Sequence, residues 1–129
     1  MIFLDTSAII ALSNRLDERH VEARALVNTL SGPAELLTHN YVVVEAFSLL
    51  HRRHGLKVAS RFAEESSAFD VVWVDRQLHE AAARSLARKG TKRSSLVDEV
   101  SFLVMRSRGI DTAFAFDSDF EREGFKTLG

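Results

Sequence analysis

Five short runs of apolar residues recur along the chain, and longer stretches of mixed polarity separate them. Several of the runs are continuously apolar instead of alternating with polar residues. This pattern is typical of strands that are covered on both faces, as in a parallel sheet. It predicts strands over residues 2–4, 35–38, 71–74, 112–116 and 125–128.

The stretches between these runs carry apolar residues at helical spacing and predict helices over residues 17–30, 41–53, 56–66, 76–89 and 95–108. Asn40 and Ser95 are candidate N-caps, and Gly55, Gly90 and Gly109 are suited to end three of the helices. Strands that alternate with helices indicate an α/β fold with a central, mostly parallel sheet and helices on both faces. We expect residues 1–129 to form a single domain, because the chain contains no repeat and no low-complexity tract.

Composition excludes several classes of protein. The chain has 17 basic and 18 acidic side chains and a net charge of -1, so it carries no strongly basic nucleic-acid arm. This balance does not exclude a local basic patch. It contains no cysteine, which excludes disulfides, a thiolate nucleophile and cysteine-ligated zinc and is compatible with the cytoplasmic location that we expect. We expect no signal peptide, because no basic region precedes the first apolar run. We expect no membrane partner, because no apolar stretch approaches the roughly 20 residues of a spanning helix.

Two aspartates follow predicted strands. Asp5 comes directly after the first apolar run, and Asp117 comes directly after the fourth. In a parallel sheet both positions lie at the carboxyl edge, where α/β folds bind their ligands. Each residue alone has a simpler interpretation as an Asx turn or a helix cap. Two acids at equivalent edges favour a shared crevice instead.

Three further acids lie on predicted helices. A helical wheel places Asp98 beside Phe102 and Met105, within an apolar patch, where a carboxylate needs a cation, a hydrogen-bond network or a cleft. An acid that interacts with the helix dipole in the first turn is the alternative interpretation of Asp98. The wheel places Glu99 beside Arg106 and predicts a solvated ion pair between them. It places Glu45 at a polar border, where a surface ion pair is an adequate explanation.

Other kinds of site find little support. The six glycines are scattered and form no phosphate loop, and no nucleophile elbow surrounds a serine. The histidines do not form a metal-binding pair on one helix face. The cluster His51-Arg52-Arg53-His54 is interpreted as a solvated face in preference to a phosphate-contacting patch.

Four segments in this order resemble the PIN-domain ribonucleases and, among them, the VapC toxins of toxin–antitoxin pairs. They are MIFLDTSA at residues 1–8, THNYVVVE at 38–45, SLVDEVSFLVM at 95–105, and the closing segment from Gly109 through AFAFDSDF at 113–120 to Phe125. The resemblance covers nearly the whole chain and implies a three-layer α/β/α fold and a metal-dependent endoribonuclease. A non-catalytic PIN-like module that binds RNA or protein is the alternative, and the intact set of acids argues against it.

The resemblance maps an acidic site onto Asp5, Glu45, Asp98 and Asp117, and so gives Glu45 a role that the wheel does not. Four carboxylates in one pocket cannot all ionise without a cation. Oxygen ligands without cysteine or histidine suit Mg²⁺ or Mn²⁺, which would hold a scissile phosphate and activate a water molecule. The expected metal ligands are Asp5, Asp98 and Asp117, with Glu45 as a further candidate. Either Asp98 or Glu45 would accept the proton of that water, and one or two metal ions are both compatible with the set.

Residues next to this quartet receive supporting roles. Asp119 is either an additional metal ligand or, in our preferred interpretation, a cap. Thr6 or Ser7 would orient the Asp5 carboxylate through a hydrogen bond. The resemblance also implies a transfer or ribosomal RNA substrate, a cognate VapB-type antitoxin that covers the site, and a homodimer. Candidate RNA contacts that would frame the acidic pocket are Arg52, Arg53, Lys89, Lys92 and Arg93, with a plain solvated loop as the alternative for the last three.

Overall fold

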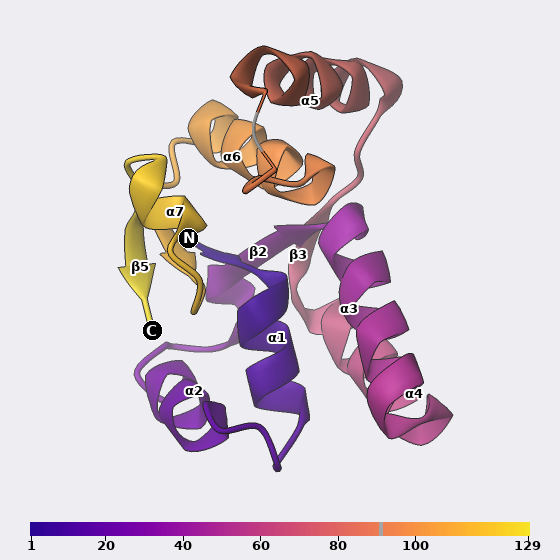
Figure 1. Cartoon of the computed structure of the whole chain (residues 1–129). Coiled ribbons are helices and arrows are strands. Elements are labelled where there is room, and N and C mark those ends of the chain that lie inside the picture. The colour runs from indigo at the N-terminus through magenta and orange to yellow at the C-terminus, as the bar shows by residue number, and fades with distance from the viewer. Residues whose placement is uncertain (91) are drawn as a thin grey trace.

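The computed structural model describes residues 1–90 and 92–129. At its centre is a five-stranded sheet in which every pair of neighbouring strands is parallel. The strand order is β3-β2-β1-β4-β5, so the first strand lies in the middle (Figure 1). The bounds are β1 Ile2–Leu4, β2 Leu36–His39, β3 Asp70–Val72, β4 Thr112–Phe114 and β5 Lys126–Leu128. The predicted α/β fold with a parallel sheet is confirmed.

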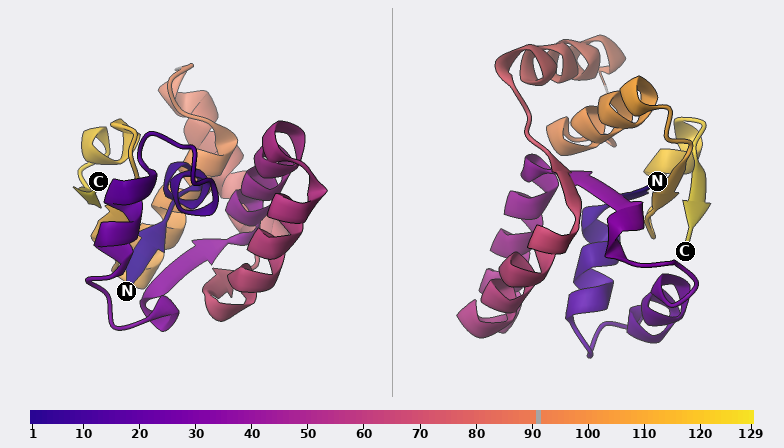
Figure 2. Two further views of the ribbon diagram at one scale, coloured as in Figure 1. Left: turned by 90° about the horizontal axis from the view of Figure 1, so that it is seen from below. Right: turned by 180° about the vertical axis from the view of Figure 1, so that it is seen from behind.

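Helices cover both faces of this sheet. The chain steps outward from β1 to β3 and then returns across β1 to reach β4 and β5. Because crossovers between parallel strands are right-handed, this reversal places the helices before β3 and those after it on opposite faces. The first group comprises α1 Thr6–Ser13, α2 His20–Val27, α3 Asn40–His54 and α4 Leu56–Glu65, and the second comprises α5 Arg76–Lys89, α6 Leu96–Arg108 and α7 Asp119–Arg122 (Figures 1 and 2). The result is the three-layer arrangement that the resemblance implies.

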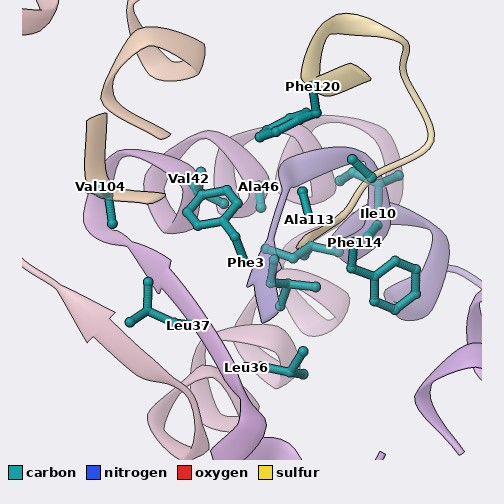
Figure 3. Close-up of a cluster of buried hydrophobic side chains, with 14 of the residues drawn as sticks. Phe3, Ile10, Leu36, Leu37, Val42, Ala46, Val104, Ala113, Phe114 and Phe120 are labelled. Atoms are coloured by element: carbon teal, nitrogen blue, oxygen red, sulfur yellow. The ribbon is translucent and has the colours of Figure 1, made fainter. Parts of the chain in front are cut away.

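The hydrophobic core lies on both sides of the central strands. Phe3 of β1 is fully buried, and its ring lies 5.9 Å from that of Phe120 in α7 (Figure 3). Phe120 in turn meets Phe102 of α6 edge to face at 5.2 Å. The next residue of β1, Leu4, points the other way and lines an apolar hollow with Ile9 of α1. Helices of both layers are therefore fixed to the strand that leads into Asp5.

The predicted elements agree with the structure to within two residues at their ends, with four exceptions. The short helix α7 was not predicted. Helix α1 was not predicted, because its residues are apolar nearly all round and show no amphipathic period. The helix predicted over residues 17–30 is shorter and spans His20–Val27. Asn40 is not the cap of α3: the His39 side chain accepts the Val42 N–H, and Asn40 Oδ1 instead accepts the Val74 N–H at 2.6 Å.

Other helix ends agree with the prediction from the sequence. Ser95 caps α6 as predicted, and Gly90 and Gly109 end α5 and α6 in the left-handed region that favours glycine. None of the helices in the described residues is both long and apolar enough to span a bilayer.

Candidate active site

Asp5 and Asp117 lie where the strand order reverses, between β1 and β4. Strands β1 and β4 are neighbours, although one lies near the start of the chain and the other near its end. The Asp5 N–H continues their pairing by donating to the Phe114 carbonyl at 3.1 Å. Open α/β sheets form a crevice outside the carboxyl ends of their strands at such a reversal, and this topology brings Asp5 and Asp117 to it.

The Asp5 carboxylate is only 3% exposed and is held by Ser7. Its Oδ2 accepts the Ser7 Oγ–H at 2.8 Å and the Ser7 N–H at 3.3 Å, and this second bond caps α1. Ser7 Oγ also accepts the Phe116 N–H at 3.0 Å. One hydroxyl therefore joins Asp5 to the residue that precedes Asp117. Thr6, the other residue considered for this role, has a buried Oγ1 without a hydrogen-bond partner.

Burial and mutual repulsion raise the pKa values of two acids here. Burial, followed by the charge of Asp117, raises the pKa of Asp5 to about 7, and the hydrogen bonds from Ser7 oppose that rise. Burial also raises the pKa of Asp98, with smaller contributions from Asp117 and Asp119, while bonds from Ser95 lower it. A bound cation would therefore lower the cost of ionising both Asp5 and Asp98.

Two helices bring the remaining members of the quartet. Glu45 lies in α3, and Asp98 lies in the first turn of α6. Asp98 Oδ2 accepts the Ser95 N–H at 3.0 Å and Ser95 Oγ accepts the Asp98 N–H at 3.1 Å, which completes a capping box. Asp98 is thus both a cleft acid and a first-turn acid, so its two interpretations are compatible.

One cleft brings all four acids together. It has a volume of about 490 Å³, and its lining also includes Thr6, Ser7, Ile10, Asp17, Glu18, Arg19, Leu49, Arg53 and Phe116.

Asp119 does not line this cleft. Its carboxylate forms an ion pair with Arg122, one turn further along α7, and its N–H donates to Asp117 Oδ1 at 3.1 Å. The contribution of Asp119 that the structure shows is to hold the Asp117 side chain, which agrees better with the turn interpretation than with a ligand.

Glu99 corrects one prediction. We expected a solvated pair with Arg106, but Glu99 is 1% exposed and accepts hydrogen bonds from Ser85, Ser94 and Lys89 at 2.8–2.9 Å. Arg106 instead pairs with Glu123 at 2.9 Å. The wheel could not reveal this burial, because α5 and the loop that follows it supply the partners.

The basic candidates occupy different places. Arg53 lines the cleft and Arg52 does not. Lys89 is held by Glu99 and Glu123, which disfavours the RNA contact proposed for it from the sequence. Lys92 is exposed, and Arg93 lines a separate small hollow beside α7. Thr91, in the same basic run, lies outside the described residues.

Sequence reasoning missed Arg19, whose guanidinium lies 5.3 Å from the centre of the Phe116 ring and at the cleft. Its neighbours Asp17 and Glu18 were missed as cleft residues as well. The signal was three consecutive charges in the loop between α1 and α2, but it was hidden because residues 17–30 were interpreted as one helix.

Within residues 1–90 and 92–129, no group of three or more His, Asp or Glu side chains has the geometry of a ready-made metal centre. Mg²⁺, however, commonly binds one or two carboxylates and keeps several waters. The Asp5 and Asp117 pair fits that mode, because both ligands are oxygens and their charges oppose each other. Asp98 and Glu45 line the same cleft and suit contacts through such waters.

Comparison with known proteins identifies the family of this chain. The family model described as PIN domain matches residues 2–126. The chain belongs to the PIN-domain family. The "23S rRNA-specific endonuclease VapC20" from two strains of Mycobacterium tuberculosis is 42% identical to this PIN-domain chain over 127 residues, which cover 97% of this chain and 95% of the relative.

A solved structure agrees as well. The crystal structure of Mycobacterium tuberculosis VapC20, described as a sarcin-ricin loop cleaving toxin, superposes with a TM-score of 0.88 at 39% identity. The match covers 97% of this PIN-domain chain and 96% of that protein. The predicted fold and the predicted function as an endoribonuclease toxin are confirmed. The assignment of individual site residues and the metal dependence stay predictions.

Proposed function

We propose that this protein is a divalent-metal-dependent endoribonuclease that cuts 23S ribosomal RNA within the sarcin–ricin loop. The observation that carries the proposal is the meeting of Asp5, Glu45, Asp98 and Asp117 in one cleft at the reversal point of the sheet. The substrate follows from the similar toxin, whose description names that loop. Identity of 42% over almost the full length supports a common substrate.

We propose Mg²⁺ or Mn²⁺ as the cofactor, held directly by Asp5 and Asp117 and through waters by Asp98 and Glu45. When bound, the ion would polarise the scissile phosphate and lower the pKa of a bound water. Zinc is disfavoured because the acidic quartet offers oxygen ligands only. Ser7 would keep the Asp5 carboxylate turned toward the ion, since it donates two hydrogen bonds to a single oxygen.

The protein must also accept the proton of the attacking water. Asp98 is the carboxylate that we assign to this role, because burial raises its pKa toward the working pH and a stronger base accepts a proton more readily. The hydrogen bond that Asp98 accepts from the Ser95 N–H fixes the carboxylate at the start of α6. Glu45 faces the same cleft from α3 and would orient the water.

An acidic cleft repels RNA, so cations must stand at its rim. Arg53 at the end of α3 and Arg19 after α1 both line the cleft, and we propose that they bind phosphates on either side of the scissile bond. Lys92 and Arg93 remain proposed contacts for more distant parts of the RNA. From the family resemblance we also propose a VapB-type antitoxin that covers the cleft, and a homodimer.

The test is cleavage of intact ribosomes by purified protein, with break sites located by primer extension on 23S rRNA. We expect a single Mg²⁺-dependent break in the sarcin–ricin loop, absent in EDTA and absent for Asp5→Asn prepared in the same way. Cleavage of transfer RNA alone would overturn the substrate. Full activity in excess EDTA would overturn the metal dependence.

A further inference from the structure

Glu45 and Asp98 reach the cleft from helices in different layers of the fold. Helix α3 belongs to the layer before β3, and α6 belongs to the layer after it. Strand pairing does not by itself set the distance between these two helices. A direct contact between α3 and α6 is needed to keep Glu45 and Asp98 at a constant separation beyond the carboxyl edge of the sheet.

His39 and Ser101 form a direct link between these layers. His39 ends β2 and caps α3, and its Nε2 lies 2.8 Å from the Oγ of Ser101 in α6. Both side chains are fully buried. Ser101 lies one turn after Asp98, and Glu45 lies less than two turns after His39, so the bond joins the segments that carry the two acids.

The neighbouring contacts fix the direction of each hydrogen bond. Ser101 Oγ–H donates to the Val97 carbonyl at 3.0 Å, which leaves its lone pairs to accept from His39. His39 Nδ1 accepts the Val42 N–H at 3.4 Å, so the ring proton resides on Nε2. One neutral tautomer therefore satisfies every partner. In agreement with this, burial lowers the pKa of His39 to about 4, so the ring stays neutral across the working range.

We propose that His39 is a positioning residue of the active site, which acts through Ser101 to set the separation of Glu45 and Asp98. This inference rests on the proposed function, because it assigns both acids to one reaction. The link ends at Val97, the residue before Asp98. A shift of α6 relative to α3 would move Asp98 away from the water that it deprotonates.

Two substitutions separate the two bonds of the ring. His39→Asn keeps an acceptor at the position of Nδ1, which is the preferred kind of helix cap, but it cannot reach Ser101. His39→Gln places an amide donor near the position of Nε2 and loses the cap. Both variants lose the packing of the imidazole against Phe3, whose ring lies 5.7 Å away, so they are matched for that loss.

We expect His39→Asn to lower kcat for RNA cleavage at least about ten-fold with little change in KM, because small misplacements of catalytic groups carry large costs in rate. His39→Gln should keep a kcat close to the wild-type value, although it loses the cap and its thermal midpoint should lie below that of His39→Asn. Ser101→Ala should match His39→Asn, and the double variant should be no slower than either single variant, because both remove the same bond.

Asn40→Ala is the matched control. It removes the adjacent bond at the start of α3, from the Val74 N–H to Asn40 Oδ1, which joins α3 to a segment that carries none of the four acids. It should lower the thermal midpoint and leave kcat unchanged. Equal kcat values for wild type, His39→Asn and Ser101→Ala would overturn the inference. So would kcat values that simply follow the thermal midpoints across the whole set.

A measurement without RNA keeps this inference separate from the proposed function. The chain has no cysteine, so spin labels can be attached at exposed Ser48→Cys in α3 and Arg108→Cys in α6. Double electron–electron resonance should give a shifted or broader distance distribution for His39→Asn, but not for Asn40→Ala. An unchanged distribution would overturn the inference. Failure of the wild-type protein to cut ribosomes would overturn the proposed function alone.

Discussion

The carboxyl group of Asp5 lies against that of Asp117, and the charge of Asp117 opposes ionisation of Asp5. The pair is formed by the neighbouring strands β1 and β4, and Ser7 bonds to both segments. Without a cation, the folded protein reduces the repulsion by retaining a proton on Asp5. Several properties of the metal-free protein follow from this.

The stability of the metal-free protein should depend on pH through Asp5. The pKa of this residue is about 7 in the folded chain and 3.8 in a reference peptide, so between these values the folded state binds more protons than the unfolded state. The free energy of unfolding should therefore fall as pH rises from about 4 to 7, by at most about 4 kcal/mol.

Urea unfolding in EDTA at several pH values measures this effect, with Asp5→Asn as control. His39, whose pKa is lowered to about 4 by burial, contributes the opposite trend, since its protonation below about 6.5 favours the unfolded chain. It does so equally in both proteins, so the difference between them isolates Asp5. Parallel curves would contradict the prediction. Excess Mg²⁺ should remove most of the destabilisation at pH 7, because it supplies the missing positive charge.

Ser7→Ala should weaken metal binding. It removes the hydrogen bond that the Ser7 hydroxyl donates to Asp5 Oδ2 and the acceptor of the Phe116 N–H. The weaker bond from the backbone N–H of residue 7 to Asp5 Oδ2 stays. We expect Mn²⁺ affinity to fall about ten- to hundred-fold, as for other groups that orient a ligand. Calorimetric titration measures it.

Thr6→Val is the matched control for Ser7→Ala, because the Thr6 hydroxyl is buried and bonds to nothing. Its replacement by a methyl group should leave Mn²⁺ affinity intact and keep or raise stability. Equal losses of affinity in the two variants would show that Ser7 has no special role.

Asp98→Asn and Glu99→Gln should separate catalysis from stability at adjacent positions. Asp98→Asn keeps the shape of the capping box and removes the base, so cleavage should fall at least about a hundred-fold at a normal or raised thermal midpoint. The single-turnover rate on ribosomes measures this. Retained activity would remove Asp98 from the site.

Glu99→Gln should lower the free energy of unfolding by about 2–3 kcal/mol, because it leaves the Lys89 ammonium with a weaker partner and breaks a buried network. Urea denaturation measures the change. Arg108→Gln, an exposed substitution later on α6, is the control and should stay within about 0.5 kcal/mol of wild type. A similar small effect for Glu99→Gln would restore the solvated interpretation.

Arg53→Ala and Arg52→Ala form a matched pair at the end of α3. Only Arg53 lines the cleft. Its loss should raise KM and reduce the salt dependence of RNA binding by about 0.7–0.9 in the logarithmic slope, the value for one phosphate contact. Arg52→Ala should change neither quantity. Filter binding at several salt concentrations measures both, and equal slopes for the two variants would place the RNA elsewhere.

The sequence predicted the strands and most helices because their apolar runs and caps are local signals. Asp5 and Asp117 could be placed together because parallel strands end at one edge, which topology alone determines. Glu45 could not be found from periodicity: its position at a polar border looks like any surface acid, and only the family resemblance identified it. The structure then placed it in the cleft.

The remaining failures share a physical cause. Glu99 and Arg106 are neighbours on a wheel, yet each bonds to a residue of another element, Glu99 to Lys89 of α5 and Arg106 to Glu123 beyond α7. Long-range partners such as these are set by packing between layers, which a single helix does not encode. His39 escaped notice for the same reason, because its bond to Ser101 joins two layers.

The central position of β1 has a consequence for synthesis of the protein. Its partner β4 is made long after it, and the cleft takes residues from both ends of the chain. A nascent chain that stops short of Asp117 has Asp5, Glu45 and Asp98 but no complete quartet, and the edge of β1 that will pair with β4 is still open. On the proposed mechanism, a nascent chain cannot cut RNA before Asp117 has been made and β4 has paired with β1, which protects the ribosome that makes it.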